Sequence, residues 1–129
     1  MSKVGYRELV EAAEQRIKII SAADAVEVLK SDDVVFVDLR DIRKLKREGG
    51  IPGAFHCPRG LLEFWIDPES PYHHAVFAEP KEFIFFCNLG WRSALAADIA
   101  QQMGLTTSHI DGGFDAWKAA GGEVAHKDK

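Results

Sequence analysis

Cys87 is the residue of this chain best placed for covalent chemistry. It follows an apolar run at residues 83–86, which predicts a strand buried on both faces, and precedes an alanine-rich run that predicts a helix. The loop between them contains Gly90, which tolerates a positive φ, so its backbone amides can turn toward an anion at the helix N-terminus. That location and the guanidinium of Arg92 favour the thiolate, the nucleophilic form of cysteine. The pattern alone also fits a small core residue at a strand end.

Asp38 and Arg40 are expected at the same edge of the sheet as Cys87. They follow residues 34–37, a β-branched apolar run that predicts a second buried strand parallel to residues 83–86. An aspartate there can hold loop amides or orient Arg92, and an arginine can bind a carboxylate through two hydrogen bonds. We expect both residues to support the loop from behind, and for Asp38 we favour a structural ion pair.

Four stretches of the chain resemble the rhodanese family of sulfurtransferases. The loop Cys87-Asn88-Leu89-Gly90-Trp91-Arg92-Ser93 resembles the family's active-site loop, in which a cysteine comes first and a glycine lies near the middle. The other matching stretches are Val37-Asp38-Leu39-Arg40, Gly50-Ile51-Pro52-Gly53-Ala54 and Gly112-Gly113-Phe114-Asp115-Ala116-Trp117. They occur in the family's order over residues 20–122. One departure is Gly50, where family members commonly carry histidine.

The resemblance implies an α/β fold and a covalent reaction. The expected rhodanese-like domain has a central, mostly parallel sheet of about five strands with helices on both faces. A sulfane sulfur would pass from an anionic donor, thiosulfate or a persulfide, to cyanide or a thiol through a persulfide on Cys87, without a cofactor. The catalytic residue would be Cys87, and the substrate-binding residues would be Asn88, Leu89, Gly90, Trp91, Arg92 and Ser93. Many thiosulfate-using relatives have cationic residues early in the loop, whereas this chain has Asn88, Leu89 and Trp91. With an apolar rim, a bulky or protein-borne persulfide is a credible donor.

Two other functions are compatible with parts of this pattern. Cysteine-dependent phosphatases and arsenate reductases also cradle an anion above a cysteine, but such phosphatases have one residue more between cysteine and arginine than Cys87 and Arg92 have here. The shorter loop favours a single sulfur over a phosphoryl group. A non-catalytic binding module could instead use the aromatic stretch at residues 59–80, although it would have no need of an activated thiol.

Composition limits the partners and the location of the protein. With 129 residues the chain is the size of one domain, and a formal net charge of -4 without a basic face argues against nucleic acid or an anionic membrane as partner. Two cysteines, no signal-peptide pattern and no apolar run near about 20 residues predict a soluble, cytoplasmic protein. His73-His74 and His56-Cys57 lack the spacing of zinc sites, so we expect no metal. The sequence does not indicate an oligomeric state.

The remaining predictions concern the segments around the site. Residues 1–19 are expected to form an accessory helix, at residues 6–15, and a strand lead-in. Residues 20–122 are expected to form the domain, and residues 123–129 a loose tail. After the loop, Leu95, Ile99 and Met103 form an apolar helical stripe, with Asp98, Gln101 and Gln102 facing water. Residues 59–80 are expected mainly to fill the core, or else to wall the site with Trp65 or Tyr72 facing Trp91, or to meet another subunit.

Overall fold

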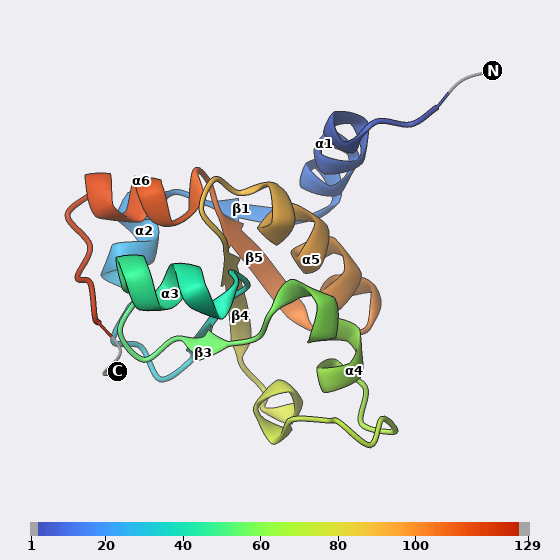
Figure 1. Cartoon of the computed structure of the whole chain (residues 1–129). Helices are drawn as coiled ribbons and strands as arrows, with labels where there is room; N and C mark the ends of the chain where they lie inside the picture. Colours follow the sequence, from blue (N-terminus) through green and yellow to red (C-terminus); the bar gives the residue numbers. More distant parts are fainter. Residues whose placement is uncertain (1–2, 127–129) are drawn as a thin grey trace.

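The structure is a computed structural model that describes residues 3–126, and its helices and strands alternate along the chain (Figure 1). The strands are β1 (Lys18–Ile20), β2 (Val34–Asp38), β3 (Phe55–His56), β4 (Glu82–Phe86) and β5 (Thr106–Ile110). The α-helices are α1 (Tyr6–Arg16), α2 (Ala22–Glu27), α3 (Ile42–Glu48), α4 (Leu62–Ile66), α5 (Trp91–Gln102) and α6 (Gly113–Ala119). Short 3-10 helices lie at Arg59–Leu61 and Ala75–Ala78.

All five strands belong to one parallel sheet in the order β1-β5-β4-β2-β3. β4 is central, and Asp38 at the end of β2 is the register partner of Phe86 at the end of β4. The predicted α/β fold, with about five mostly parallel strands, is confirmed. Because parallel strands end at the same edge, the segments after β2 and β4 lie next to each other there.

Alternate side chains of β4 fill two separate cores. Phe83 and Phe85 are buried with Leu62 and the alanines of α5, whereas Ile84 and Phe86 are buried with Trp117 of α6. Figure 1 shows α4 and α5 on one face of the sheet and α2 and α6 on the other. A strand buried on both faces has no polar side, which explains the unbroken apolar run at residues 83–86.

The predicted orientation of α5 is wrong at Asp98 and Met103. Asp98 is 6% exposed and Met103 38% exposed, while the buried side of the helix is made mainly of alanines. The reason is that α5 is covered by α1 as well as by the sheet: Val10 and Ala13 pack on Ala94. The buried charge of Asp98 is balanced by Arg16 of α1, whose guanidinium nitrogens donate hydrogen bonds to the two carboxylate oxygens at 2.9 and 2.6 Å.

Segment 59–80 fills the core and does not wall the site. Leu62, Ile66 and Phe77 are buried, which confirms the core-filling interpretation. The ring of Trp65 is stacked on that of His74 at 3.9 Å between centroids, and Tyr72 is exposed. Trp91 instead has the ring of Tyr6 as its neighbour, at 4.9 Å.

The chain after α6 is held at two points within the described residues. The indole Nε1 of Trp117 donates to the Glu123 carbonyl at 2.8 Å, and Gly50 and Ala125 exchange two backbone hydrogen bonds of 2.8 Å. The sequence predicts a loose tail from residue 123, whereas residues 123–126 follow this path; residues 127–129 lie outside the described part. No helix among residues 3–126 has the length and apolarity needed to cross a bilayer.

The buried Cys57 predicts a specific loss of stability at alkaline pH. Burial raises the pKa of this thiol from 9.0 to about 12, so it stays protonated in the folded state after an exposed thiol would ionise. Its contribution to stability is therefore complete below pH 9 and is lost as pH rises toward 12. Urea unfolding at several pH values should show a steeper fall in the free energy of unfolding for wild type than for Cys57→Ala across this range. Parallel curves would contradict the assignment, because the lost packing of the alanine variant acts equally at every pH.

Candidate active site

The loop of residues 87–90 joins the end of β4 to the start of α5. Cys87 follows Phe86 directly, and Gly90 has φ 106, which confirms the predicted positive φ. The first-turn amides of α5 have no preceding helical carbonyl to bind, so this helix end presents free donors and a partial positive charge beside the loop.

The sulfur of Cys87 is buried but has polar neighbours. The residue is only 2% exposed, as expected for a core cysteine. Its Sγ, however, accepts a hydrogen bond from the Gly90 amide at 3.2 Å and lies 3.8 Å from Ser93 Oγ. The sulfur therefore has a backbone hydrogen-bond donor and a hydroxyl beside it, contacts that a purely apolar core would not supply.

The carbonyls around Cys87 are bound to neighbouring backbone. The Leu39 amide donates to Phe86 O at 3.0 Å, and the Phe114 amide donates to Cys87 O at 2.8 Å. The Asp115 amide donates to Asn88 O at 3.3 Å. These bonds fix the peptide planes of the loop with their carbonyl oxygens directed at β2 and α6.

Gly113 allows α6 to come this close to the loop. It has φ 62, and a Cβ built on it would lie 2.5 Å from both the Cys87 and the Asn88 carbonyl oxygens. The sequence prediction missed this role, although the paired Gly112-Gly113 before a helix was its signal.

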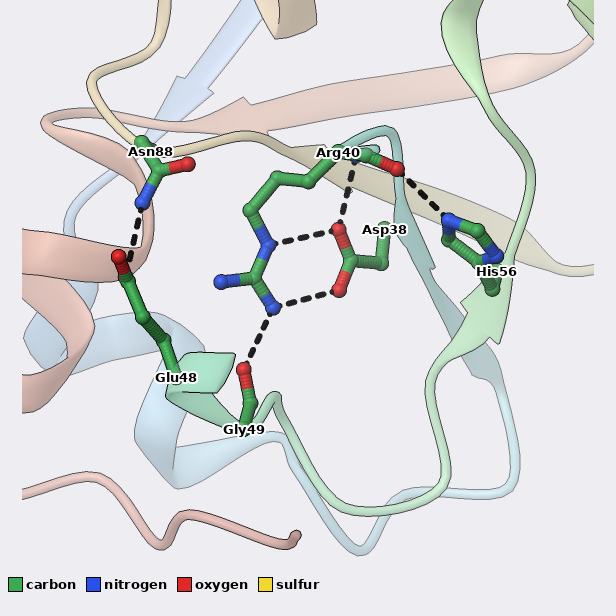
Figure 2. Close-up of polar contacts among 6 residues, drawn as sticks. All are labelled: Asp38, Arg40, Glu48, Gly49, His56 and Asn88. Atoms are coloured by element: carbon green, nitrogen blue, oxygen red, sulfur yellow. Dashed lines mark hydrogen bonds and ion pairs between the residues drawn. The ribbon is translucent and has the colours of Figure 1, made fainter. Parts of the chain in front are cut away.

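Asp38 and Arg40 form a buried ion pair behind the loop (Figure 2). Arg40 Nε and Nη2 donate to the two Asp38 oxygens at 2.9 and 2.7 Å, and Nη2 also donates to Gly49 O at 2.7 Å. The guanidinium carbon lies 4.4 Å from the ring centroid of Phe114, in the first turn of α6. Both Asp38 oxygens are used by Arg40, so Asp38 forms the structural ion pair that we favoured and does not orient Arg92.

The other predicted loop residues point in different directions. The Asn88 amide nitrogen donates to Glu48 of α3 at 3.3 Å (Figure 2). Leu89 and Trp91 are 57% and 50% exposed, and Arg92 is exposed on the first turn of α5. The structure therefore brings Gly90 and Ser93 to the sulfur by direct contact, and places Leu89, Trp91 and Arg92 at the rim.

A histidine that the sequence analysis did not assign to the site lies behind Ser93. His109 Nδ1 is 3.0 Å from Ser93 Oγ, and the ring is 1% exposed. Burial lowers the pKa of His109, with Asp111 acting weakly in the opposite direction. His109 Nε2 lies 3.6 Å from Glu14 Oε2 of α1. The only sequence signal was a polar residue at a buried position of β5.

The histidines considered for a metal have other neighbours. His56 Nε2 lies 2.7 Å from Arg40 O, and His73 Nδ1 lies 3.0 Å from Trp65 O. Across residues 3–126, no group of three histidine, cysteine, aspartate or glutamate side chains is arranged to hold a metal ion.

Comparison with known proteins points to one family. The rhodanese-like domain model matches residues 21–120. Thiosulfate sulfurtransferase GlpE of Pseudoalteromonas translucida is 34% identical over an alignment of 115 residues that covers 85% of this chain and 97% of that protein. Putative sulfurtransferase YtwF of Bacillus subtilis is 29% identical over 103 residues, and the match covers 79% of this chain and 91% of the Bacillus protein. A solved protein of unknown function from Rhodopseudomonas palustris, described as a possible tyrosine phosphatase, is 49% identical, with a TM-score of 0.93 and 97% of each chain covered.

The approach of α6 to the loop can be tested with two glycine variants. Both Gly113→Ala and Gly121→Ala put a side chain at positive φ, but only the Gly113 variant meets backbone oxygens, since Gly121 faces open space. We expect Gly113→Ala to lower the free energy of unfolding by about 1–3 kcal/mol more than Gly121→Ala does. Urea denaturation of the two variants measures this difference, and equal losses would show that the close contact is unimportant.

Proposed function

Because the chain belongs to the rhodanese-like domain family, we propose that it is a sulfurtransferase that carries a sulfane sulfur as a persulfide on Cys87. The single observation that supports this most directly is the hydrogen bond from the Gly90 amide to Cys87 Sγ at the head of α5. It places a hydrogen-bond donor on the sulfur at a helix N-terminus, a position that favours negative charge. The sulfurtransferase names of the relatives with 34% and 29% identity support the same reaction class.

In the first step the Cys87 thiolate attacks the outer sulfur of an anionic donor. With thiosulfate, a sulfur–sulfur bond forms to Cys87, the donor's own sulfur–sulfur bond breaks, and its electron pair leaves on sulfite. The enzyme then carries a persulfide anion, and neither a general base nor a cofactor is required. The amides at the start of α5 would stabilise the terminal sulfur, since they have no helical carbonyl to bind.

In the second step an acceptor attacks the terminal sulfur of the persulfide. A thiolate acceptor leaves as its own persulfide, cyanide leaves as thiocyanate, and Cys87 is released as the thiolate. This is covalent catalysis with two half-reactions. The exposed Leu89 and Trp91 make the rim of the loop partly apolar, which suits a persulfide donor bulkier than thiosulfate.

Phosphatase activity is the second candidate. It is favoured by the similarity to the Rhodopseudomonas palustris protein that is described as a possible tyrosine phosphatase. It is disfavoured by the short spacing from Cys87 to Arg92, and by the exposure of Arg92, which lies on the first turn of α5. A narrower loop accommodates a lone sulfur more readily than a tetrahedral phosphoryl group.

Thiosulfate treatment followed by intact mass measurement tests the proposed function. We expect a gain of about one sulfur atom, mapped to Cys87 by peptide analysis, and its removal by cyanide with formation of thiocyanate. Cys87→Ala should abolish both, whereas Cys57→Ala should retain them because Cys57 is buried after β3, which β2 separates from β4 in the sheet. Full transfer by Cys87→Ala would overturn the mechanism. Hydrolysis of p-nitrophenyl phosphate that depends on Cys87, without persulfide formation, would favour the phosphatase.

A further inference from the structure

A cleft lies between the N-terminal helix α1 and the loop that follows Cys87. Its volume is about 360 Å³, within the range of small-molecule sites. The aromatic rings of Tyr6 and Trp91 form part of its wall, and Gly90 is another lining residue. The amide of the same Gly90 donates to Cys87 Sγ, so Gly90 belongs both to the lining of the cleft and to the surroundings of the sulfur.

The cleft contains a buried polar atom without a protein partner. His109 is a lining residue, its side chain is 1% exposed, and its Nε2 makes no hydrogen bond within the described part of the chain. Nε2 faces Glu14 Oε2 at 3.6 Å, beyond hydrogen-bond distance. A buried polar atom of this kind calls for a ligand or water to bind it.

The hydrogen bonds around the sulfur indicate what His109 offers to the cleft. When Cys87 Sγ carries no proton, as in the thiolate or the persulfide, the Ser93 hydroxyl can donate to Sγ, and Ser93 Oγ then accepts from Nδ1–H of His109. Burial keeps the ring neutral, which leaves Nε2 as a lone-pair acceptor. Nε2 and the Glu14 carboxylate are then two acceptors facing each other, and a donor between them would satisfy both.

The charges around the cleft favour a cationic donor. Glu11, Glu14 and Asp111 contribute three carboxylates, and the only cationic lining residue is Arg7. The Arg7 Nε already donates to Tyr6 Oη at 3.2 Å, with its guanidinium over the Tyr6 ring. An ammonium group supplies three N–H donors and also binds well beside aromatic rings.

We propose that this cleft binds the ammonium group of a small aminothiol that acts as the sulfur acceptor. The inference rests on the proposed function, because it assigns the acceptor of that reaction. With its ammonium between His109 Nε2 and Glu14, the acceptor presents its thiolate toward the Gly90 side of the cleft. That thiolate attacks the terminal sulfur of the persulfide, the bond to Cys87 Sγ breaks, and Cys87 leaves as a thiolate.

Thiol–disulfide exchange tests the cleft without relying on sulfur transfer. The probes are three small disulfides of different charge: cationic cystamine, neutral bis(2-hydroxyethyl) disulfide and anionic 3,3′-dithiodipropionate. Each forms a mixed disulfide with Cys87 and releases one thiolate, and the rate is followed by mass spectrometry with peptide mapping. We expect Glu14→Lys to lower the cystamine rate relative to the neutral probe about tenfold and to raise the relative rate of the anionic probe.

Glu27→Lys is the matched control, because it makes the same charge change at an exposed position of α2, outside the cleft. It should leave all three relative rates at the wild-type values. The proposal is overturned if the ratio of cystamine to dithiodipropionate rates is the same in wild type, Glu14→Lys and Glu27→Lys. It is equally overturned if both lysine variants change the ratio alike, since the effect would then come from net charge.

A second measurement connects the cleft to catalysis. With thiosulfate as donor, kcat/KM for cysteamine relative to 2-mercaptoethanol should fall about tenfold in Glu14→Lys and stay unchanged in Glu27→Lys. Comparing this ratio of kcat/KM values between variants cancels the difference in intrinsic reactivity between the two thiols. An unchanged ratio in active Glu14→Lys would overturn the acceptor assignment. Absence of any persulfide would refute the proposed function, while the disulfide rates would still decide whether the cleft binds ammonium.

Discussion

The site depends on how three successive carbonyls are bound. Phe86, Cys87 and Asn88 direct their oxygens to backbone amides of Leu39, Phe114 and Asp115, which leaves the turn free to present the Gly90 amide to sulfur. In a trans peptide the C=O of one residue and the N–H of the next lie on opposite sides, so these three bonds fix the peptide planes that lead from Phe86 to Leu89, the residue before the Gly90 amide. The first turn of α6 is therefore as necessary to the loop as the loop's own residues are. This explains why a glycine must begin that helix.

The buried pair of Asp38 and Arg40 supports the same arrangement from the other side. It joins the end of β2 to the Gly49 carbonyl, and its guanidinium lies against Phe114 of α6. A buried ion pair adds little net stability compared with apolar residues, but removal of either partner leaves an uncompensated charge. We interpret the pair as a device that fixes the relative positions of β2, the α3–β3 turn and α6, all of which border the loop.

The sequence predicted the structural features that depend on residues close together in the chain. The apolar runs at residues 34–37 and 83–86 indicated the buried strands, Gly90 the positive φ, and Asp38 the ion pair. It did not predict contacts that arise only when distant elements meet. The burial of Asp98 depends on Arg16 of α1, and the place of His109 behind Ser93 depends on the alignment of β5 with α5. The sequence around a histidine in a short strand does not indicate that its ring will contact a serine of another element.

The helix α1 lies outside residues 21–120, the part that matches the family model, yet it provides Tyr6 and Glu14 to the cleft that Leu89 and Gly90 also line. The parts that hold the sulfur and the part that lines its approach are thus separate along the chain. If the cleft binds the acceptor as proposed, a change in this N-terminal segment would alter the choice of acceptor without altering the loop that holds Cys87. Diversification at the N-terminus would then be a route by which proteins with this architecture acquire new physiological roles.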